Sequence, residues 1–337
     1  VASTAAIAAV GAVPVFADVK PDQNIDPDAV EAAITDKTKA VMPVHLTGRV
    51  AEMDRIMEIA ARHGLKVIED AAQSFGSRYQ DVMSGAIGDA GCFSAHPLKN
   101  LNAAGDAGFI TTDDDDMAAR VRLLRNHGLK DRETVVEWGT VSRLDNLQAA
   151  ILTYRLGRVD AVVEKRRANA ELYRALLPDA HVFMPPCRQQ EFNTFHTFVV
   201  QVDRRDELRA YLAEHGIETA VHYPVPIHLQ PAAADMGHKM GDFPATEEQA
   251  ARIVSLPVHQ FLSEDDIPAA SPEQYVATEN QTLSITSTDG VLANDSDQDG
   301  DVLRALIVSS TTPSRSRFHS AANRPCSSRF WYTQSPV

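Results

Sequence analysis

The stretch from residue 66 to residue 112 constrains the fold most, because its apolar runs end in small and charged residues. Residues 65–68 form a short apolar run with β-branched members, and a Glu-Asp pair that ends in Asp70 follows it. Such a run predicts a buried parallel strand with Asp70 at its carboxyl end. Residues 90–94 and 108–111 predict two further strands of this kind. Ligands of open α/β sheets bind outside the carboxyl ends of the strands, so Asp70 is expected at a site.

Lys99 lies in the connection between the last two of these strands, after Pro97, which disfavours helix at the residue before it. A buried lysine is costly unless it pairs, loses its proton or forms a covalent adduct such as a Schiff base with an aldehyde cofactor. Pyridoxal phosphate requires such a lysine together with a carboxylate on its pyridine nitrogen. Lys99 and Asp70 are the right residue types. The alternative is a helix-capping Asp70 and a solvated loop Lys99, and spacing alone does not decide between the two interpretations.

The remaining pattern alternates between helices and strands before it changes to a longer helical region. Helices are predicted for residues 2–10, 26–34 and 53–63, and strands for residues 13–16 and 39–44. This alternation predicts a mainly parallel sheet. The carboxyl-terminal half predicts a helical region over 142–177 that bends near Gly157, a strand over 197–202 and a helix over 205–215. These last elements are typical of a smaller α+β domain.

Eight motifs follow one another along the chain: EDAAQSFGS, GDAGCFSAHPLKN, GDAGFITTDDDD, RLLRNHG, SRLDNLQAAIL, HYPVPIHLQPA, GDFPATEEQA and SLPVHQFL. Their content and order closely resemble the motifs of the sugar aminotransferases of the DegT/DnrJ/EryC1/StrS family. Several independent motifs in order are far more specific than any one of them. The resemblance covers residues 1–267. It implies an α/β fold of the aspartate-aminotransferase type (fold type I), with a mainly parallel sheet domain and a smaller α+β carboxyl-terminal domain.

The resemblance implies roles for four residues that match the family motifs. Asp70 is expected to contact the pyridine nitrogen of pyridoxal phosphate, Gln73 to lie near the ring hydroxyl, and Ser94 to hold the phosphate. Lys99 is expected to form the Schiff base, and a lysine at this position, rather than the histidine of some relatives, implies transamination rather than dehydration. The implied reaction moves an amino group from an amino acid, with glutamate as the expected donor, to a keto group of a nucleotide-linked sugar in amino sugar and polysaccharide biosynthesis.

The chain departs from the family pattern at two places. The family often has an asparagine that reaches the phosphate of the neighbouring subunit in a homodimer, and Val141 stands there in this chain and cannot donate that hydrogen bond. The family also has a segment before the position of Val1 that supplies a phosphate-binding turn and an aromatic residue on the cofactor ring. The chain as given is therefore expected to bind pyridoxal phosphate weakly.

Three histidines and one acidic run are further candidates. His228 lies in a proline-rich loop that borders the substrate entrance in relatives, so substrate contact is one hypothesis and structural packing is the alternative. His45 and His96 follow strand ends, and packing in a loop is favoured for both. Four aspartates at 113–116 precede a helix pattern and are expected to cap it rather than bind a metal.

Composition excludes several other classes of protein. The 337 residues are enough for a large core, and a net charge of -14 argues against a non-specific nucleic-acid binder. Three widely spaced cysteines imply no disulfide framework. The first 19 residues lack the basic region of a signal peptide and are interrupted by Gly11 and Pro14, so no membrane span is expected and a cytoplasmic location is predicted.

The end of the chain changes character after Ile267. Residues 268–312 resemble a partial Ig-like or cadherin-like repeat of bacterial surface proteins, and residues 313–337 are predicted to be disordered. An aspartate-rich run over 295–301 resembles an EF-hand opening, but Leu306 stands where a bidentate glutamate is required.

The resulting domain prediction divides the chain into a partial cofactor-binding domain over 1–140, a helical connection with a small domain over 141–267, and the two tail segments. The alternative is that the chain is an inactive fragment, or a surface-associated binding module that is defined by the repeat and carries the front part as a passenger.

Overall fold

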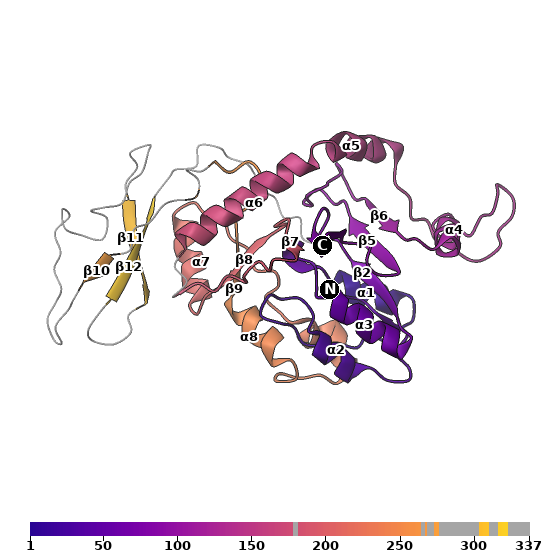
Figure 1. Ribbon diagram of the computed structural model, residues 1–337, viewed down its shortest axis with the longest axis horizontal. Helices are drawn as coiled ribbons and strands as arrows, with labels where there is room; N and C mark the ends of the chain where they lie inside the picture. Colours follow the sequence, from indigo (N-terminus) through magenta and orange to yellow (C-terminus); the bar gives the residue numbers. More distant parts are fainter. Residues whose placement is uncertain (178–180, 264–266, 268–272, 276–302, 310–315, 323–337) are drawn as a thin grey trace.

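The computed structural model describes residues 1–177, 181–263, 267, 273–275, 303–309 and 316–322 (Figure 1). Its α-helices are α1 Ala2–Ala9, α2 Pro27–Ala33, α3 Met53–His63, α4 Asp115–Leu124, α5 Asn146–Leu156, α6 Val159–Leu176, α7 Arg205–Glu214 and α8 Pro244–Arg252. Its strands are β1 Ala40–Val41, β2 Lys66–Asp70, β3 Arg78–Tyr79, β4 Val82–Met83, β5 Ala90–Ser94, β6 Gly108–Thr111, β7 Glu191–Phe192, β8 Phe198–Gln201, β9 Ile253–Leu256, β10 Glu273–Tyr275, β11 Leu303–Ser309 and β12 Ser316–Ala322.

A four-stranded sheet with the order β1-β2-β5-β6 carries the predicted site. Strands β1, β2 and β5 run parallel, and Asp70 is in register with Cys92 of β5. The prediction of a third parallel strand over 108–111 is wrong, because β6 pairs with β5 in the antiparallel sense. A parallel partner requires a crossover of a dozen or more residues, usually with a helix. Residues 95–107 instead form turns, and the Ala95 amide donates to the Ala107 carbonyl at 2.8 Å.

Local capping signals explain why the helices begin and end where the sequence predicts. Asp26 caps α2 by accepting from the Asp28 amide at 3.0 Å, and Asp114 caps α4 by accepting from the Met117 amide at 2.9 Å. The acidic run therefore includes the predicted helix cap. Gly64 ends α3 with a left-handed φ of 64°, which glycine adopts at no steric cost. The long helical region is divided into α5 and α6 at Gly157, as expected.

The prediction of a strand over residues 13–16 is wrong. Val13 and Val15 are 81% and 68% exposed, and this segment is not part of a sheet. Phe16 packs at 6.2 Å, between ring centroids, against Phe243, which precedes α8. The apolar run therefore links α1 to the carboxyl-terminal part rather than adding a strand. The strand predicted over 39–44 is shorter in the structure, since β1 is followed by a single bridge between Val44 and Asp70.

Two of the three hydrophobic clusters among the described residues lie in different halves of the body. The first packs α3 against the parallel strands through buried side chains that include Met53, Ile56 and Val67. The second lies between α6 and the β8-β9 pair and includes Tyr173, Phe198, Val254 and Ile267. Helix α6 extends from the α5 end of the molecule to α7 (Figure 1).

The segment after Phe16 is tied to the carboxyl-terminal part by side-chain capping across the chain. Asp18 accepts from the backbone amides of Ala245 and Thr246 at 3.0 and 2.9 Å and from the Thr246 hydroxyl at 2.7 Å. Burial alone would raise the pKa of Asp18, but these hydrogen bonds bring that pKa below its usual value. Asp18 thus supplies to α8 the N-terminal cap that its own flanking residue does not.

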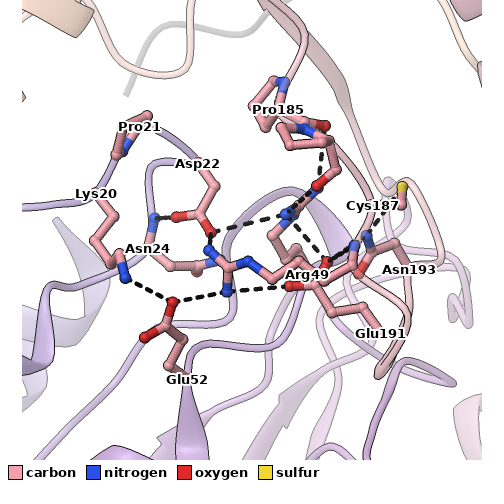
Figure 2. Close-up of polar contacts among 12 residues, drawn as sticks. Lys20, Pro21, Asp22, Asn24, Arg49, Glu52, Pro185, Cys187, Glu191 and Asn193 are labelled. Atoms are coloured by element: carbon pink, nitrogen blue, oxygen red, sulfur yellow. Dashed lines mark hydrogen bonds and ion pairs between the residues drawn. The ribbon is translucent and has the colours of Figure 1, made fainter.

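A partly buried ionic cluster makes a second connection (Figure 2). The Arg49 guanidinium is paired with Glu191 at 3.1 Å and donates to the Pro185 carbonyl at 3.2 Å. Arg188 donates to Asp22 at 3.0 Å and pairs with Glu52 at 2.8 Å. Because Arg49 directly follows the 3-10 turn Leu46–Gly48, this cluster fixes that turn against the segment before β7.

Near the end of the chain, the described strands form an antiparallel sheet with the order β10-β12-β11. Strand β12 lies within the segment predicted to be disordered. The aspartate-rich run over 295–301 and most of the predicted repeat lie outside the described residues. The alternative of a surface-associated binding module depends on that repeat and therefore stays a prediction. The domain boundaries stay predictions.

Candidate active site

Asp70, the last residue of β2, is held through its backbone and both carboxylate oxygens. Its amide donates to the Pro43 carbonyl at 2.9 Å, and its carbonyl accepts from the His45 amide at 3.0 Å. In the side chain, Oδ2 accepts from the Ser3 hydroxyl at 2.6 Å and Oδ1 accepts from the Ala72 amide at 3.1 Å. Asp70 therefore presents an oriented carboxylate at the carboxyl edge of the parallel strands, where the sequence placed it.

Lys99 lies at the same edge, in the turn after β5. Its amide donates to the His96 carbonyl at 2.9 Å, and the neighbouring Asn100 side chain donates to the Thr194 carbonyl at 3.2 Å. Burial lowers the pKa of Lys99, and the nearby Asp70 carboxylate opposes that shift. The structure thus places Lys99 and Asp70 at the same sheet edge, after two neighbouring parallel strands and within electrostatic range of each other. A half-buried lysine beside a carboxylate does not fit the alternative of a solvated loop residue.

Two imidazoles that the sequence did not single out as catalytic lie within electrostatic reach of Lys99. Burial holds the pKa of His196 well below its usual value, and the charge of Lys99 adds to this shift. Burial and the same charge also lower the pKa of His222, whose Nδ1 lies 2.8 Å from the Ser255 hydroxyl. Both rings are therefore neutral near neutral pH. His196 stands in an apolar FHTF run before β8, so no local polar pattern pointed to it.

The turn Leu46–Gly48 brings the His196 segment close to the sheet. The Thr194 amide donates to the Gly48 carbonyl at 3.0 Å. A Cβ on Gly48 would lie 2.7 Å from the Phe195 nitrogen, and the φ of this glycine is +91°, so a larger residue is excluded on two grounds. This close backbone approach places residues 194–197 beside the Lys99 turn.

Gln73 and Ser94 also lie at the ends of the site strands. Gln73, three residues after β2, accepts from the Thr47 amide at 2.8 Å. Ser94 ends β5 and its hydroxyl accepts from the His96 amide at 3.3 Å. His96 thus contributes backbone to the Lys99 turn. The contacts of Gln73 and Ser94 with a cofactor stay predictions.

His228 is buried away from solvent. Its Nε2 lies 2.8 Å from the Glu247 carboxylate, and its ring centroid lies 4.6 Å from that of Phe243. The residue is 3% exposed. This geometry fits the packing alternative, and substrate contact by His228 stays a hypothesis without support from these contacts.

His45 and Glu69 form a buried pair on the other side of β2. Successive strand residues face opposite sides of a sheet, so Glu69 points inward where Asp70 faces the site. The Glu69 carboxylate, 0% exposed, lies 2.8 Å from His45 Nε2 and accepts from the amides of Gly85, Ile87 and Gly88 at 2.7 Å each. Burial alone raises the pKa of Glu69, but these partners bring it below its usual value. His45 is therefore a packed residue, as favoured from the sequence.

The described residues fit pyridoxal phosphate as a cofactor. The half-buried Lys99, whose pKa is lowered by burial, would supply the amine, and the oriented Asp70 carboxylate at the same sheet edge would suit a protonated ring nitrogen. This α/β sheet, with a lysine and a carboxylate at one edge, has the features of the fold type I aminotransferases.

No described helix is long and apolar enough to cross a membrane.

Comparison with known proteins identifies the family. The model of the DegT/DnrJ/EryC1/StrS aminotransferase family matches residues 1–270, and the chain belongs to this family. It is 44% identical to a pleiotropic regulatory protein of Geobacillus stearothermophilus, over 82% of this chain and 73% of that protein. It is 42% identical to the dTDP-3-amino-3,4,6-trideoxy-alpha-D-glucose transaminase of Streptomyces venezuelae, over 78% and 70% of the two chains. Among solved structures, S. venezuelae DesV in complex with a ketimine intermediate is similar with a TM-score of 0.76, 41% identity, and coverage of 79% and 72%.

Proposed function

We propose that this protein transfers an amino group from an amino acid, with glutamate as the donor, to the keto group of a nucleotide-linked sugar. The observation that carries the proposal is geometric: Asp70 ends β2 and Lys99 follows β5, its parallel neighbour, so both residues lie at one carboxyl edge of the sheet. The relatives support the substrate class, since the similar Streptomyces venezuelae protein is a transaminase of a dTDP-linked amino sugar.

Four side chains would hold the cofactor, each at a different group of it. Lys99 would supply the amine that holds pyridoxal phosphate, and Asp70 would accept a hydrogen bond from its pyridine nitrogen. Ser94 would donate to the phosphate, and Gln73 would lie near the ring hydroxyl. When bound, pyridoxal phosphate supplies the electron sink that stabilises a substrate carbanion.

Lys99 also moves the proton of the reaction. Its Nζ would act as the general base that takes the proton from the substrate carbon and later gives it back. A general base works best when its pKa lies near the operating pH. Burial of Lys99 acts in this direction, because it lowers the pKa and increases the fraction of neutral amine.

A reductive labelling experiment tests the proposal. Protein saturated with pyridoxal phosphate and reduced with borohydride is expected to give a modified peptide that contains Lys99. Only the neutral amine attacks the aldehyde, so labelling falls as the pH drops through the pKa of Lys99. Because burial lowers that pKa, labelling of Lys99 is expected to persist to lower pH than the same reaction of a free lysine amine. Peptide mapping that finds the label only on other lysines would refute the assignment.

We also propose that the protein forms a homodimer. Large apolar side chains are exposed in the loop after α4 and on α5: Trp138 at 91%, Leu147 at 69% and Tyr154 at 66%. Exposed apolar surface of this kind marks interaction sites. Sedimentation equilibrium is expected to give twice the chain mass, and Leu147→Glu with Tyr154→Glu is expected to shift the protein toward monomer. A wild-type protein that sediments as a monomer at micromolar concentration would contradict this proposal.

A further inference from the structure

Ser3 connects helix α1 to the candidate active site. Its hydroxyl donates to Asp70 Oδ2 at 2.6 Å, although the two residues are 67 positions apart in the sequence. No residue of α1 is buried, so the helix does not sit here to fill the core. The hydrogen bond from Ser3 is therefore a specific contact between α1 and the sheet edge.

This contact helps to fix the orientation of the Asp70 carboxylate plane. The last side-chain torsion of an aspartate is broad and roughly two-fold, so rotamer preference alone does not fix the plane of the carboxylate. Hydrogen bonds from Ser3 at Oδ2 and from the Ala72 amide at Oδ1 fix it from both sides. A hydrogen bond to an ionised acceptor is about twice as strong as a neutral one.

The two donors leave the carboxylate able to bind a further group. Each carboxylate oxygen has about two lone-pair sites, and each oxygen of Asp70 uses one of them for the donors named above. One N–H donor, such as a protonated pyridine nitrogen, can therefore bind while both existing hydrogen bonds are retained.

We infer that Ser3 is a positioning residue that orients the Asp70 carboxylate toward the pyridine nitrogen of pyridoxal phosphate. The inference rests on the proposed function, since it requires that Asp70 serves this cofactor. Ser3 acts through Asp70, so its effect is expected first in cofactor affinity.

The test compares three variants by titration of the apo protein with pyridoxal phosphate, followed by absorbance. Ser3→Ala removes the hydroxyl and is expected to weaken binding by about tenfold. Alanine is the best helix former, so this loss cannot arise from a weaker α1. Ser3→Thr keeps the hydroxyl and is expected to bind within threefold of wild type. Thr4→Ala, one position further along the same helix, is the matched control and is expected to bind like wild type.

The outcomes separate the inference from the proposed function. If wild type binds and is labelled at Lys99 but Ser3→Ala binds equally well or more tightly, the inference is wrong and the proposed function stands. An equal loss in Thr4→Ala, or no rescue by Ser3→Thr, would also overturn the inference, because the loss would then belong to the helix and not to the Ser3 hydroxyl. If wild type takes up no pyridoxal phosphate at Lys99, the proposed function fails and the inference falls with it.

Discussion

Replacing Lys99 with alanine is expected to reduce amino transfer by at least about 10³-fold. Under the proposed function, the variant loses both the amine that would hold the cofactor and the group that would move the proton at the substrate carbon. The half-reaction with glutamate measures this loss without knowledge of the sugar, since the absorbance of the cofactor changes as the amino group arrives. Saturating pyridoxal phosphate keeps weak binding from being mistaken for lost chemistry.

The fold of the Lys99→Ala variant is expected to be unchanged. The substitution removes a half-buried amine whose lowered pKa shows that burial disfavours its charge, so the thermal midpoint stays close to that of wild type. Lys37→Ala, at an exposed position, is the matched control and retains full activity. Activity of Lys99→Ala above a tenth of wild type would show that another group moves the proton.

The parts of the fold that the sequence predicted are those with a local physical cause. The bounds of α3 follow from an amphipathic period and a glycine stop, and β2 and β5 follow from short apolar runs. Asp70 could be placed at the site because the carboxyl ends of parallel strands meet at one edge of the sheet. Lys99 could be placed at the same edge of the sheet, because it lies in the turn that follows β5.

The parts that the sequence did not predict depend on contacts between distant residues. The direction of β6 is set by how residues 95–107 fold back, which no hydrophobic period encodes. The apolar residues 13–16 have the composition of a strand but lie against the segment before α8. The hydrogen bond from Ser3 to Asp70 joins residues whose separation leaves no local pattern.

The structural role of Glu69 was not predicted from the sequence, because only the second residue of the Glu-Asp pair, Asp70, was expected to have a function. Alternation along β2 sends the first carboxylate into the interior. There it is the common acceptor for the His45 ring and for the backbone of the loop that leads from β4 to β5. The Ala51 amide donates to His45 Nδ1 at 3.2 Å, so the ring proton lies on Nε2 and points at Glu69.

Replacing Glu69 with alanine is therefore expected to destabilise the protein by about 3–5 kcal/mol, because it leaves the buried His45 imidazole, one buried amide and two part-buried amides without their acceptor. The thermal midpoint is expected to fall by on the order of 10 °C. Glu69→Gln keeps the size and one carbonyl acceptor, so it is expected to lose less.

The pH dependence identifies the cause of this loss. The folded-state pKa of Glu69 lies below its ordinary value of 4.5, so the carboxylate stabilises the fold fully above that value. This stabilisation is lost as the pH falls through the lowered pKa. Urea unfolding at several pH values is expected to show a difference between wild type and Glu69→Gln that is constant near neutrality and shrinks in acid. A difference that does not change with pH would assign the loss to packing around Glu69 and not to its charge.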